Sequence, residues 1–520
     1  MRTALALVAG LFLTVTTRAA ETNAPSPFEV AIATSPISQV DQLVAAKLQR
    51  LGIQQAHPSS DAVFVRRVYL DVVGTLPTAE EAQTFLDDAA MNKRRVLIDR
   101  LLERDEFADY WAMKWSDLLR VKAEFPINLW PNAVQAYHRW IRTSIAENKP
   151  YDRFARELLT SNGSNFRMPP VNFYRAMQNK TPEGIAATVA LTFMGSRADK
   201  WPQDRRDGMA AFFAQLGYKA TGEWKEEIVF VDPAKPAPAA AKFPDGTPAK
   251  PSPDRDPREV FADWLITPEN PWFTANIANR VWSWLLGRGL IHEPDDLRAD
   301  NPPINPELLA YLQRELVGAR YDLKHLFRLI LNSRTYQLSS IPRSKHPEAE
   351  ANFAHYSLRR LEAEVLIDAL NQITGTTEKY ASAIPEPFTF IPDDQRAIAL
   401  GDGSITSSFL ELFGRSSRDT GLEGERNSRI TGAQRLHLLN SSHIQKKLEQ
   451  GQNIQPVLRS KKPLREITRT LYLTILSRPP TEHELKQVEA YSQPPSGPAP
   501  NAPLDTAWAL INSAEFLYRH

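Results

Sequence analysis

The 520-residue sequence contains no cysteine. This absence excludes disulfides, thiolate metal sites, cysteine nucleophiles, iron–sulfur clusters and covalently attached c-type haem. An excess of one charge is lacking too, since 62 Lys and Arg face 61 Asp and Glu, for a net charge of +1. Charge alone therefore excludes a strongly basic nucleic-acid binder and gives no attraction to anionic membranes. Glycine is scarce, with 22 residues against 40 prolines, which indicates many helix ends and stiff connections.

Common catalytic and nucleotide-binding motifs are also missing. The sequence has no Walker A loop, no G-x-G-x-x-G, no H-E-x-x-H, no EF-hand loop and no G-x-S-x-G. His437 and His443 lie six residues apart, a spacing that predicts different faces of one helix and argues against a two-histidine metal site. We therefore expect no resident metal or cofactor.

The N-terminus is typical of a secretory signal peptide over residues 1–19. Arg2 precedes an apolar run from Ala4 to Val15, and Thr17 and Ala19 are small residues at the places that signal peptidase reads. The alternative is an anchor that stays uncut. No later segment reaches the roughly 20 apolar residues that span a bilayer. We expect an exported protein, periplasmic or extracellular, with no nucleic-acid partner and no membrane span after cleavage.

Composition and periodicity divide the remaining chain into four parts. Residues 20–40 are polar and suggest a flexible lead-in, residues 41–231 and 258–520 have helical periodicity, and residues 232–257 form a connector rich in proline and alanine. Residues 222–231 end in a β-branched, aromatic run that predicts a strand. The predicted fold is mainly α, with two helical domains, a small β element and the Pro-rich connector between them. A parallel α/β fold is disfavoured because alternating strand and helix signals are missing.

Helix-start signals are strong in the first helical part. Asp61 can cap an apolar helix that ends at Gly74, Thr78 and Glu81 have the spacing of a capping box, and Thr181 precedes a proline at the first helical position. Two short patterns also recur along the chain, and we interpret both as helix-packing signatures: Tyr69-Leu70…Pro77-Thr78…Glu81 with Tyr472-Leu473…Pro480-Thr481…Glu484, and Leu331-Asn332-Ser333…Tyr336 with Ile511-Asn512-Ser513…Phe516.

Two kinds of residue cluster could carry chemistry. The segment His292-Glu293-Pro294-Asp295-Asp296 could bind a hard cation or supply an acid and a base, or it could be an exposed acidic turn. The tryptophans could stack on sugars or anchor the core; those in basic or polar surroundings are Trp111, Trp115, Trp282 and Trp284.

Several long strings identify a family resemblance. They include Phe64-Val65-Arg66-Arg67-Val68-Tyr69-Leu70-Asp71, Lys114-Trp115-Ser116-Asp117-Leu118-Leu119-Arg120, Asn279-Arg280-Val281-Trp282, Ser333-Arg334-Thr335-Tyr336-Gln337-Leu338-Ser339-Ser340 and Leu436-His437-Leu438-Leu439-Asn440. In this order they resemble the paired bacterial envelope families called domain of unknown function 1549 and domain of unknown function 1553, which are associated with planctomycete cytochromes. The resemblance covers nearly the whole chain after the leader.

The resemblance implies two cysteine motifs that this chain lacks. Related sequences carry C-x-x-C-H between flanks that correspond here to 193–197 and 200–204, and only Ala198 and Asp199 stand between them. A C-x-C-E-R string corresponds to Leu422-Glu423-Gly424-Glu425-Arg426. The resemblance therefore implies a cysteine-less member that has lost the haem or metal motifs.

Three functional hypotheses follow. The first is an exported scaffold or interaction protein whose partners are cytochrome-bearing or other envelope proteins. The second is an extracellular hydrolase acting on polysaccharide, with Asp295, Asp296 and Glu425 as candidate carboxylates and Arg280 or Arg426 as anion clamps. The third is carbohydrate binding through Trp111, Trp115, Trp282 and Trp284. The sequence leaves the oligomeric state open.

Overall fold

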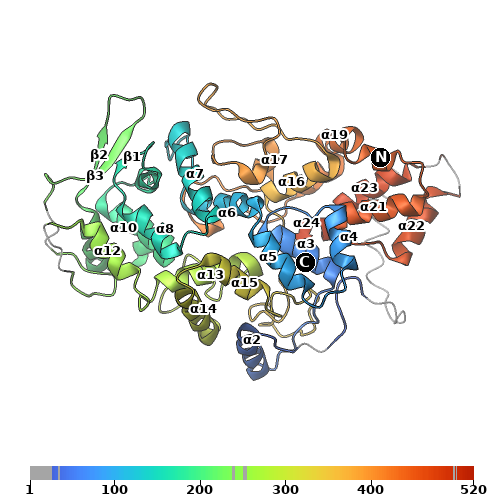
Figure 1. Cartoon of the computed structure of the whole chain (residues 1–520), viewed down its shortest axis with the longest axis horizontal. Coiled ribbons are helices and arrows are strands. Elements are labelled where there is room, and N and C mark those ends of the chain that lie inside the picture. The colour runs from blue at the N-terminus through green and yellow to red at the C-terminus, as the bar shows by residue number, and fades with distance from the viewer. Residues whose placement is uncertain (1–25, 33–34, 237–239, 250–253, 496–497, 499) are drawn as a thin grey trace.

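The computed structural model describes residues 26–520 apart from 33–34, 237–239, 250–253, 496–497 and 499. Helices dominate, which confirms the predicted fold class (Figure 1). The helices up to residue 210 are α2(Gln39–Arg50), α3(Asp61–Val72), α4(Ala79–Asp87), α5(Lys93–Leu102), α6(Asp105–Leu118), α7(Pro131–Ala146), α8(Tyr151–Thr160), α9(Asn172–Arg175), α10(Pro182–Met194) and α11(Gln203–Ala210). Those after it are α12(Pro257–Leu265), α13(Phe273–Leu286), α14(Pro306–Gly318), α15(Leu323–Leu331), α16(Ala363–Thr374), α17(Ser408–Leu412), α18(Gly432–Asn440), α19(Ser442–Gln450), α20(Gln455–Leu458), α21(Leu464–Leu476), α22(Glu482–Ser492), α23(Ala502–Ile511) and α24(Ala514–Leu517).

The β structure is small. An antiparallel sheet of order β1-β3-β2 joins Gly163–Ser164, Glu227–Val231 and Leu216–Ala220. The strand predicted at 222–231 is β3, and residues 221–226 connect it to β2. A second pair joins β4(Arg359–Arg360) to β5(Tyr518–Arg519). Short 3₁₀ turns complete the structure: Pro169–Val171, Ala198–Lys200, Ala211–Phe213, Ala397–Ala399 and Glu423–Glu425.

The helix-start signals are confirmed in two cases and corrected in one. Thr78 and Glu81 form the capping box of α4, and the Thr181 side chain caps α10. The cap of α3 is Ser60, because its hydroxyl accepts the backbone N–H of Val63 at 3.3 Å. Asp61 is instead the first helical residue, where its carboxylate pairs with Lys93 and Arg94 and also opposes the positive end of the helix dipole.

The two helical parts share one hydrophobic core. The chain returns at its end to α3, and Figure 1 shows the C-terminus beside that helix. Arg66 of α3 donates to the carbonyl of Phe516 at 2.9 Å, and Arg67 donates to the carbonyl of Tyr336 at 2.6 Å. Phe516 and Tyr336 end the two recurring Asn-Ser turns of the sequence. The two turns therefore supply the carbonyl groups to which Arg66 and Arg67, adjacent residues of the buried helix α3, donate.

The lead-in and the connector both make contacts with the helical parts. The predicted signal peptide, residues 1–19, lies outside the described residues. Within the described lead-in, the amide of Val30 donates to the carbonyl of Pro58 at 2.9 Å. Within the connector, the amide of Lys242 donates to the carbonyl of Gly208 at 3.0 Å. In the part of the chain that the structure describes, no helix combines the length and apolar character needed to cross a bilayer.

Candidate functional site

A polar cleft of about 570 Å³ opens where α6, α13, α16 and the C-terminal strand β5 approach one another. Its floor and walls carry both signs of charge, and the charged residues that line it are Lys114, Arg288, Glu293, Glu350, Arg359, Arg360, Glu362, Glu423, Arg426 and Arg519. Pockets with convergent polar groups are the usual location of binding and catalysis. We therefore take this cleft as the candidate site.

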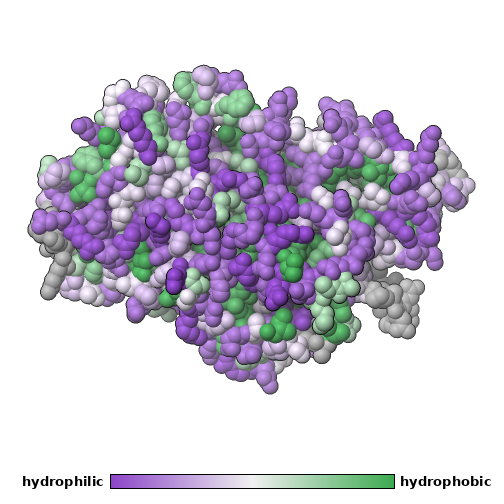
Figure 2. All heavy atoms as spheres, in the orientation of Figure 1, coloured by the Kyte–Doolittle hydropathy of each residue, from purple (hydrophilic) through white to green (hydrophobic). Residues whose placement is uncertain are grey.

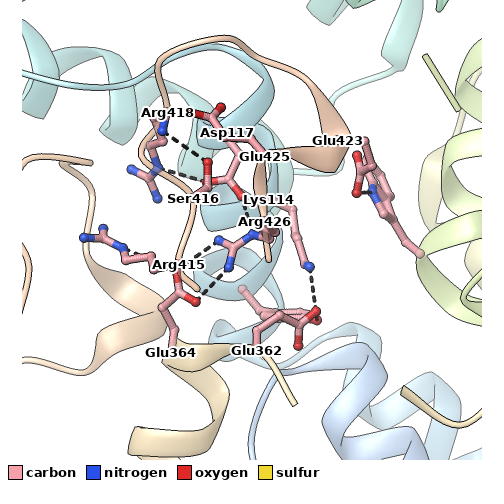
Figure 3. A network of polar contacts seen from close by, with 12 residues as sticks. Lys114, Asp117, Glu362, Glu364, Arg415, Ser416, Arg418, Glu423, Glu425 and Arg426 are labelled. Carbon is pink, nitrogen blue, oxygen red and sulfur yellow. Dashed lines mark hydrogen bonds and ion pairs between the residues drawn. The ribbon is translucent and has the colours of Figure 1, made fainter. Parts of the chain in front are cut away.

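One side of the cleft is supported by a buried network of three arginines and two carboxylates (Figure 3). Arg426 contacts Asp117 of α6 at 2.5 Å and Glu364 of α16 at 2.8 and 3.0 Å. Arg418 also binds Asp117, and Arg415 also binds Glu364. Burial opposes ionisation of Glu364, but Arg426 and Arg415 outweigh it and lower its pKa to about 2. The network thus fixes the 415–426 segment between two helices.

A second network holds the cleft-lining carboxylate of Glu362. This residue precedes α16, and its carboxylate forms ion pairs with Lys114 of α6 at 2.7 Å and with Arg519 of β5 at 2.6 Å. Burial would raise its pKa, but the charges of Arg519 and Lys114 hold that pKa well below its ordinary value. Glu362 is therefore ionised across the physiological range, and its ion pairs keep the Lys114 ammonium at the cleft.

Glu423, which also lines the cleft, has a pKa shifted in the opposite direction to that of Glu362. Trp284 donates its indole N–H to one carboxyl oxygen of Glu423 at 2.9 Å, and Arg280 lies 3.4 Å from the other. Burial raises the pKa of Glu423, and the charges of Arg280 and Lys114 offset only part of that rise. The cleft thus contains one glutamate whose pKa is raised and another whose pKa is held low.

The five site residues proposed from sequence do not form one constellation. Arg280 and Asp295 are brought together, at 2.5 Å, and both are buried. Asp296 pairs with Arg298 at 3.1 Å outside the cleft lining. Glu425 accepts the backbone N–H of Asp419 at 2.9 Å and so stabilises its own loop. Of the five, only Arg426 lines the cleft.

The four tryptophans considered for sugar stacking are core residues. Trp282 is fully buried, and Trp111, Trp115 and Trp284 are at most 9% exposed. The rings of Trp111 and Trp284 pack against each other at 5.2 Å. Carbohydrate binding through these indoles is therefore wrong, because their faces are covered by the protein itself.

The spacing argument for His437 and His443 is also wrong. The two residues do not share a helix: α18 ends at Asn440 and α19 begins at Ser442. This break brings their ring nitrogens to 3.2 Å, and Glu378 accepts from the far side of His443 at 2.8 Å. Among the described residues, no group of three or more potential ligands has the geometry to hold a metal ion.

Sequence reasoning missed Glu362, Glu364, Lys114 and Asp117. A usable signal was present for two of them, since Lys114 and Asp117 stand three apart on a predicted helix and so share a face. Glu362 and Glu364 gave no such signal, because their partners lie more than 50 residues away along the chain.

Comparison with family models matches residues 39–217 to a protein of unknown function (DUF1549) and residues 257–492 to a protein of unknown function (DUF1553). The chain belongs to the paired DUF1549–DUF1553 family. No curated protein and no solved structure matches it.

In this DUF1549–DUF1553 protein, the two segments where the resemblance implies cysteines, 193–204 and 422–426, lie beside one loop. The backbone N–H of Leu297 donates to the carbonyl of Gly195, in the first segment, at 2.8 Å. The carboxylate of Asp295 accepts the backbone N–H of Glu423, in the second segment, at 2.7 Å. The loop from Pro294 to Leu297 therefore connects both segments through hydrogen bonds.

Proposed function

We propose that this DUF1549–DUF1553 protein is exported and hydrolyses a polysaccharide at the cleft. The observation that carries the proposal is that two glutamates held by different partners line one cleft: Glu423 accepts the Trp284 indole N–H at 2.9 Å, and Glu362 pairs with Lys114 at 2.7 Å. The directions of their pKa shifts, upward for Glu423 and downward for Glu362, support it. Environments that separate the pKa values of two carboxyls in one cleft are typical of acid–base sites.

The chemistry assigns a separate task to each carboxyl. Protonated Glu423 donates its proton to the glycosidic oxygen as the carbon–oxygen bond breaks. A water molecule adds its hydroxyl to the sugar carbon, and the water's remaining proton restores the Glu423 carboxyl. Glu362 remains an anion that stabilises positive charge on the sugar ring and holds Lys114 at the cleft.

The Glu423→Gln variant tests this assignment. The amide keeps an oxygen that can accept from Trp284 but cannot donate a proton as an acid. We expect reducing-end release from a panel of neutral and acidic polysaccharides to fall about 10²-fold or more, the usual contribution of general acid catalysis. Glu350→Gln, at an exposed residue of the same cleft, is the matched control and should retain the rate. An unchanged rate in Glu423→Gln contradicts the proposal.

A second candidate is a non-catalytic scaffold or interaction protein of the envelope that works with cytochrome-bearing relatives. It is favoured by two cleft arginines whose terminal nitrogens are already bonded within the protein. Arg426 commits both terminal nitrogens to Glu364, and Arg359 commits its own to Asp71 and to two backbone carbonyls of α13. Affinity capture from the native envelope tests this candidate. Specific co-purification of cytochrome-bearing proteins, with no hydrolysis of any polysaccharide in the panel, would support it.

A further inference from the structure

Aromatic rings from three distant segments meet on one edge of the molecule, two of them exposed and the third, Trp130, partly buried. Trp130 precedes α7, Trp224 lies in the turn between β2 and β3, and Phe388 lies in the loop between α16 and α17. The Trp130 ring is 6.3 Å from that of Trp224 and 5.4 Å from that of Phe388. Figure 1 places the β2–β3 turn, α7 and the α16–α17 loop along the upper edge, where Figure 2 shows hydrophobic atoms at the surface.

Apart from Trp130, the aromatic rings on this edge are exposed to an unusual extent for their size. Trp224 is 68% exposed, Phe388 43% and the neighbouring Phe390 70%. We call Trp130, Trp224, Phe388 and Phe390 the aromatic strip. Trp224 and Phe388 both pack against Trp130, and clustered apolar side chains mark a binding surface more often than scattered ones do.

The backbone that presents the strip is strained. Trp130 has φ of 73°, and two nearby non-glycine residues, Asn128 and Lys225, have φ of 60° and 62°. The indole N–H of Trp130 is buried without an acceptor in the structure. Strain and an unpaired donor both cost stability and persist only where the surroundings enforce them. Here Asp402 accepts the amide of Ala123 at 2.9 Å and so fixes the loop that leads to Trp130.

The strip continues into a groove of about 500 Å³. Phe390 lines this groove opposite α7, which contributes Gln135 and Arg139. Arg139 is exposed and forms no ion pair with any described residue. At the other end of the strip, the Lys225 ammonium lies 5.1 Å from the Trp130 ring and 5.3 Å from the Trp224 ring, and it too has no carboxylate partner among the described residues. Two cations, neither paired with a carboxylate of the described residues, thus flank the rings.

We propose that the aromatic strip and its groove bind a polysaccharide that carries carboxylate or sulfate groups. Sugar rings present apolar C–H faces that pack on exposed indole and phenyl rings, and their hydroxyls can bond Gln135. The acidic groups pair with Lys225 and Arg139. An apolar partner would desolvate both cations without compensation, which disfavours it. The strip would then hold the polymer outside the hydrolytic cleft, so the inference rests on the proposed polysaccharide substrate.

Affinity gel electrophoresis of the full mature chain tests the proposal. The probes are polygalacturonate, dextran sulfate and neutral dextran. We expect retardation by at least one acidic polymer, weaker retardation by dextran, and a loss of retardation at high salt. The Trp224→Ala/Phe390→Ala double variant should bind about tenfold more weakly or worse, as when stacking on aromatic side chains is removed. Lys225→Gln should weaken binding of acidic polymers only.

Leu436→Ala is the matched control, because Leu436 is 60% exposed on α18 and belongs neither to the strip nor to the lining of its groove, and it should leave retardation unchanged. Circular dichroism confirms that each variant is folded. Unchanged retardation in the double variant and in Lys225→Gln, or no retardation of the parent by any acidic polymer, overturns the proposal. Capture of a protein or of lipid vesicles that depends on Trp224 in place of polymer binding also overturns it.

The same gels separate this inference from the proposed hydrolase. Glu423→Gln should lose hydrolysis and keep retardation, since Glu423 does not belong to the strip. If hydrolysis is absent in every protein but retardation depends on the strip, the hydrolase fails and the strip stands. If Glu423→Gln abolishes hydrolysis while the strip variants bind normally, the proposed polysaccharide-binding strip fails and the proposed hydrolase is supported.

Discussion

Asp295 accepts the backbone N–H of Glu423 at 2.7 Å, and its second carboxylate oxygen contacts Arg280 at 2.5 Å. This one carboxylate therefore fixes Glu423 relative to α13, which also supplies the Trp284 indole to Glu423. Glu423 stands between Leu422 and Gly424, the two positions where the family resemblance implies cysteines. In this chain, an ion pair and hydrogen bonds hold the segment without thiols.

Loss of Arg426 should destabilise the whole fold. Arg426→Ala leaves Asp117 with one arginine and Glu364 with one arginine, both buried. We expect the free energy of unfolding to fall by about 3 to 5 kcal/mol, the usual result of breaking a buried ion pair. Urea denaturation followed by circular dichroism measures it.

Arg465→Ala provides the comparison for that experiment. Arg465 is partly exposed and pairs with Glu482 and Glu489, which are also partly exposed. Arg465→Ala should lower the free energy of unfolding by at most about 1 kcal/mol. Equal costs for the two variants would show that the buried network contributes nothing beyond a surface pair.

Gly195 should not tolerate a side chain. Its φ is +59°, and an added Cβ would lie 2.6 Å from the amide oxygen of Asn276 and 2.9 Å from the carbonyl oxygen of Pro294. Gly52 has a similar φ of +66° but no atom within 4 Å of its added Cβ. Gly52→Ala should therefore lower the free energy of unfolding only by the backbone strain, about 1 to 2 kcal/mol. Gly195→Ala should lower it clearly more, because the added Cβ also clashes with Asn276 and Pro294. Thermal unfolding of both variants gives the comparison, and equal melting temperatures would contradict close packing at residue 195.

Acid should destabilise the protein partly through His138. Burial lowers the pKa of His138 to about 3, with help from the charges of Arg418 and Arg142, against an ordinary value of 6.5. The unfolded chain therefore takes up this proton as the pH falls below 6.5, while the folded protein does not until about pH 3. Stability from this group is present above pH 6.5 and is lost progressively toward pH 3.

His138→Gln should therefore flatten the pH dependence of the unfolding free energy across that window. Urea denaturation at several pH values measures the slope. His346→Gln, at an exposed histidine, is the control and should leave the slope as it is. A slope that His138→Gln does not change would show that the ring is accessible to protons in the folded protein.

No covalent haem should be found. The chain has no cysteine to form thioethers. Protein expressed in a periplasm with active c-type cytochrome maturation should show no Soret band after acid–acetone extraction. A band that survives this treatment would contradict the loss of haem chemistry.

Export should remove the first 19 residues. Protein secreted from a bacterial host should begin at Ala20, because Thr17 and Ala19 fit the cleavage preference. N-terminal sequencing of the secreted protein reads this directly. A mature chain that still begins at Met1 in the membrane fraction would instead support the uncut anchor.

Local signals in the sequence were enough for the helix starts at Thr78 and Thr181 and for β3, but they did not predict the other four described strands. Thr78 and Thr181 cap the helices that follow them because a cap needs only a side chain and the next three residues. Where a neighbour competes, local reasoning fails: Ser60 takes the cap of α3, and Asp61 next to it becomes the first helical residue. The His437–His443 contact was missed because a one-residue break between two helices changes which faces meet.

By itself, the sequence determined the mainly helical fold, the family and the exclusion of thiol chemistry, since each follows from composition or from contiguous strings. Only the tertiary structure decided which charges meet. Glu362 gains its low pKa from Lys114 and Arg519, which lie far from it along the chain, and Glu423 gains its raised pKa from burial against α13. Electrostatic energies depend on distance in space and on burial, and neither is encoded in any short stretch of sequence.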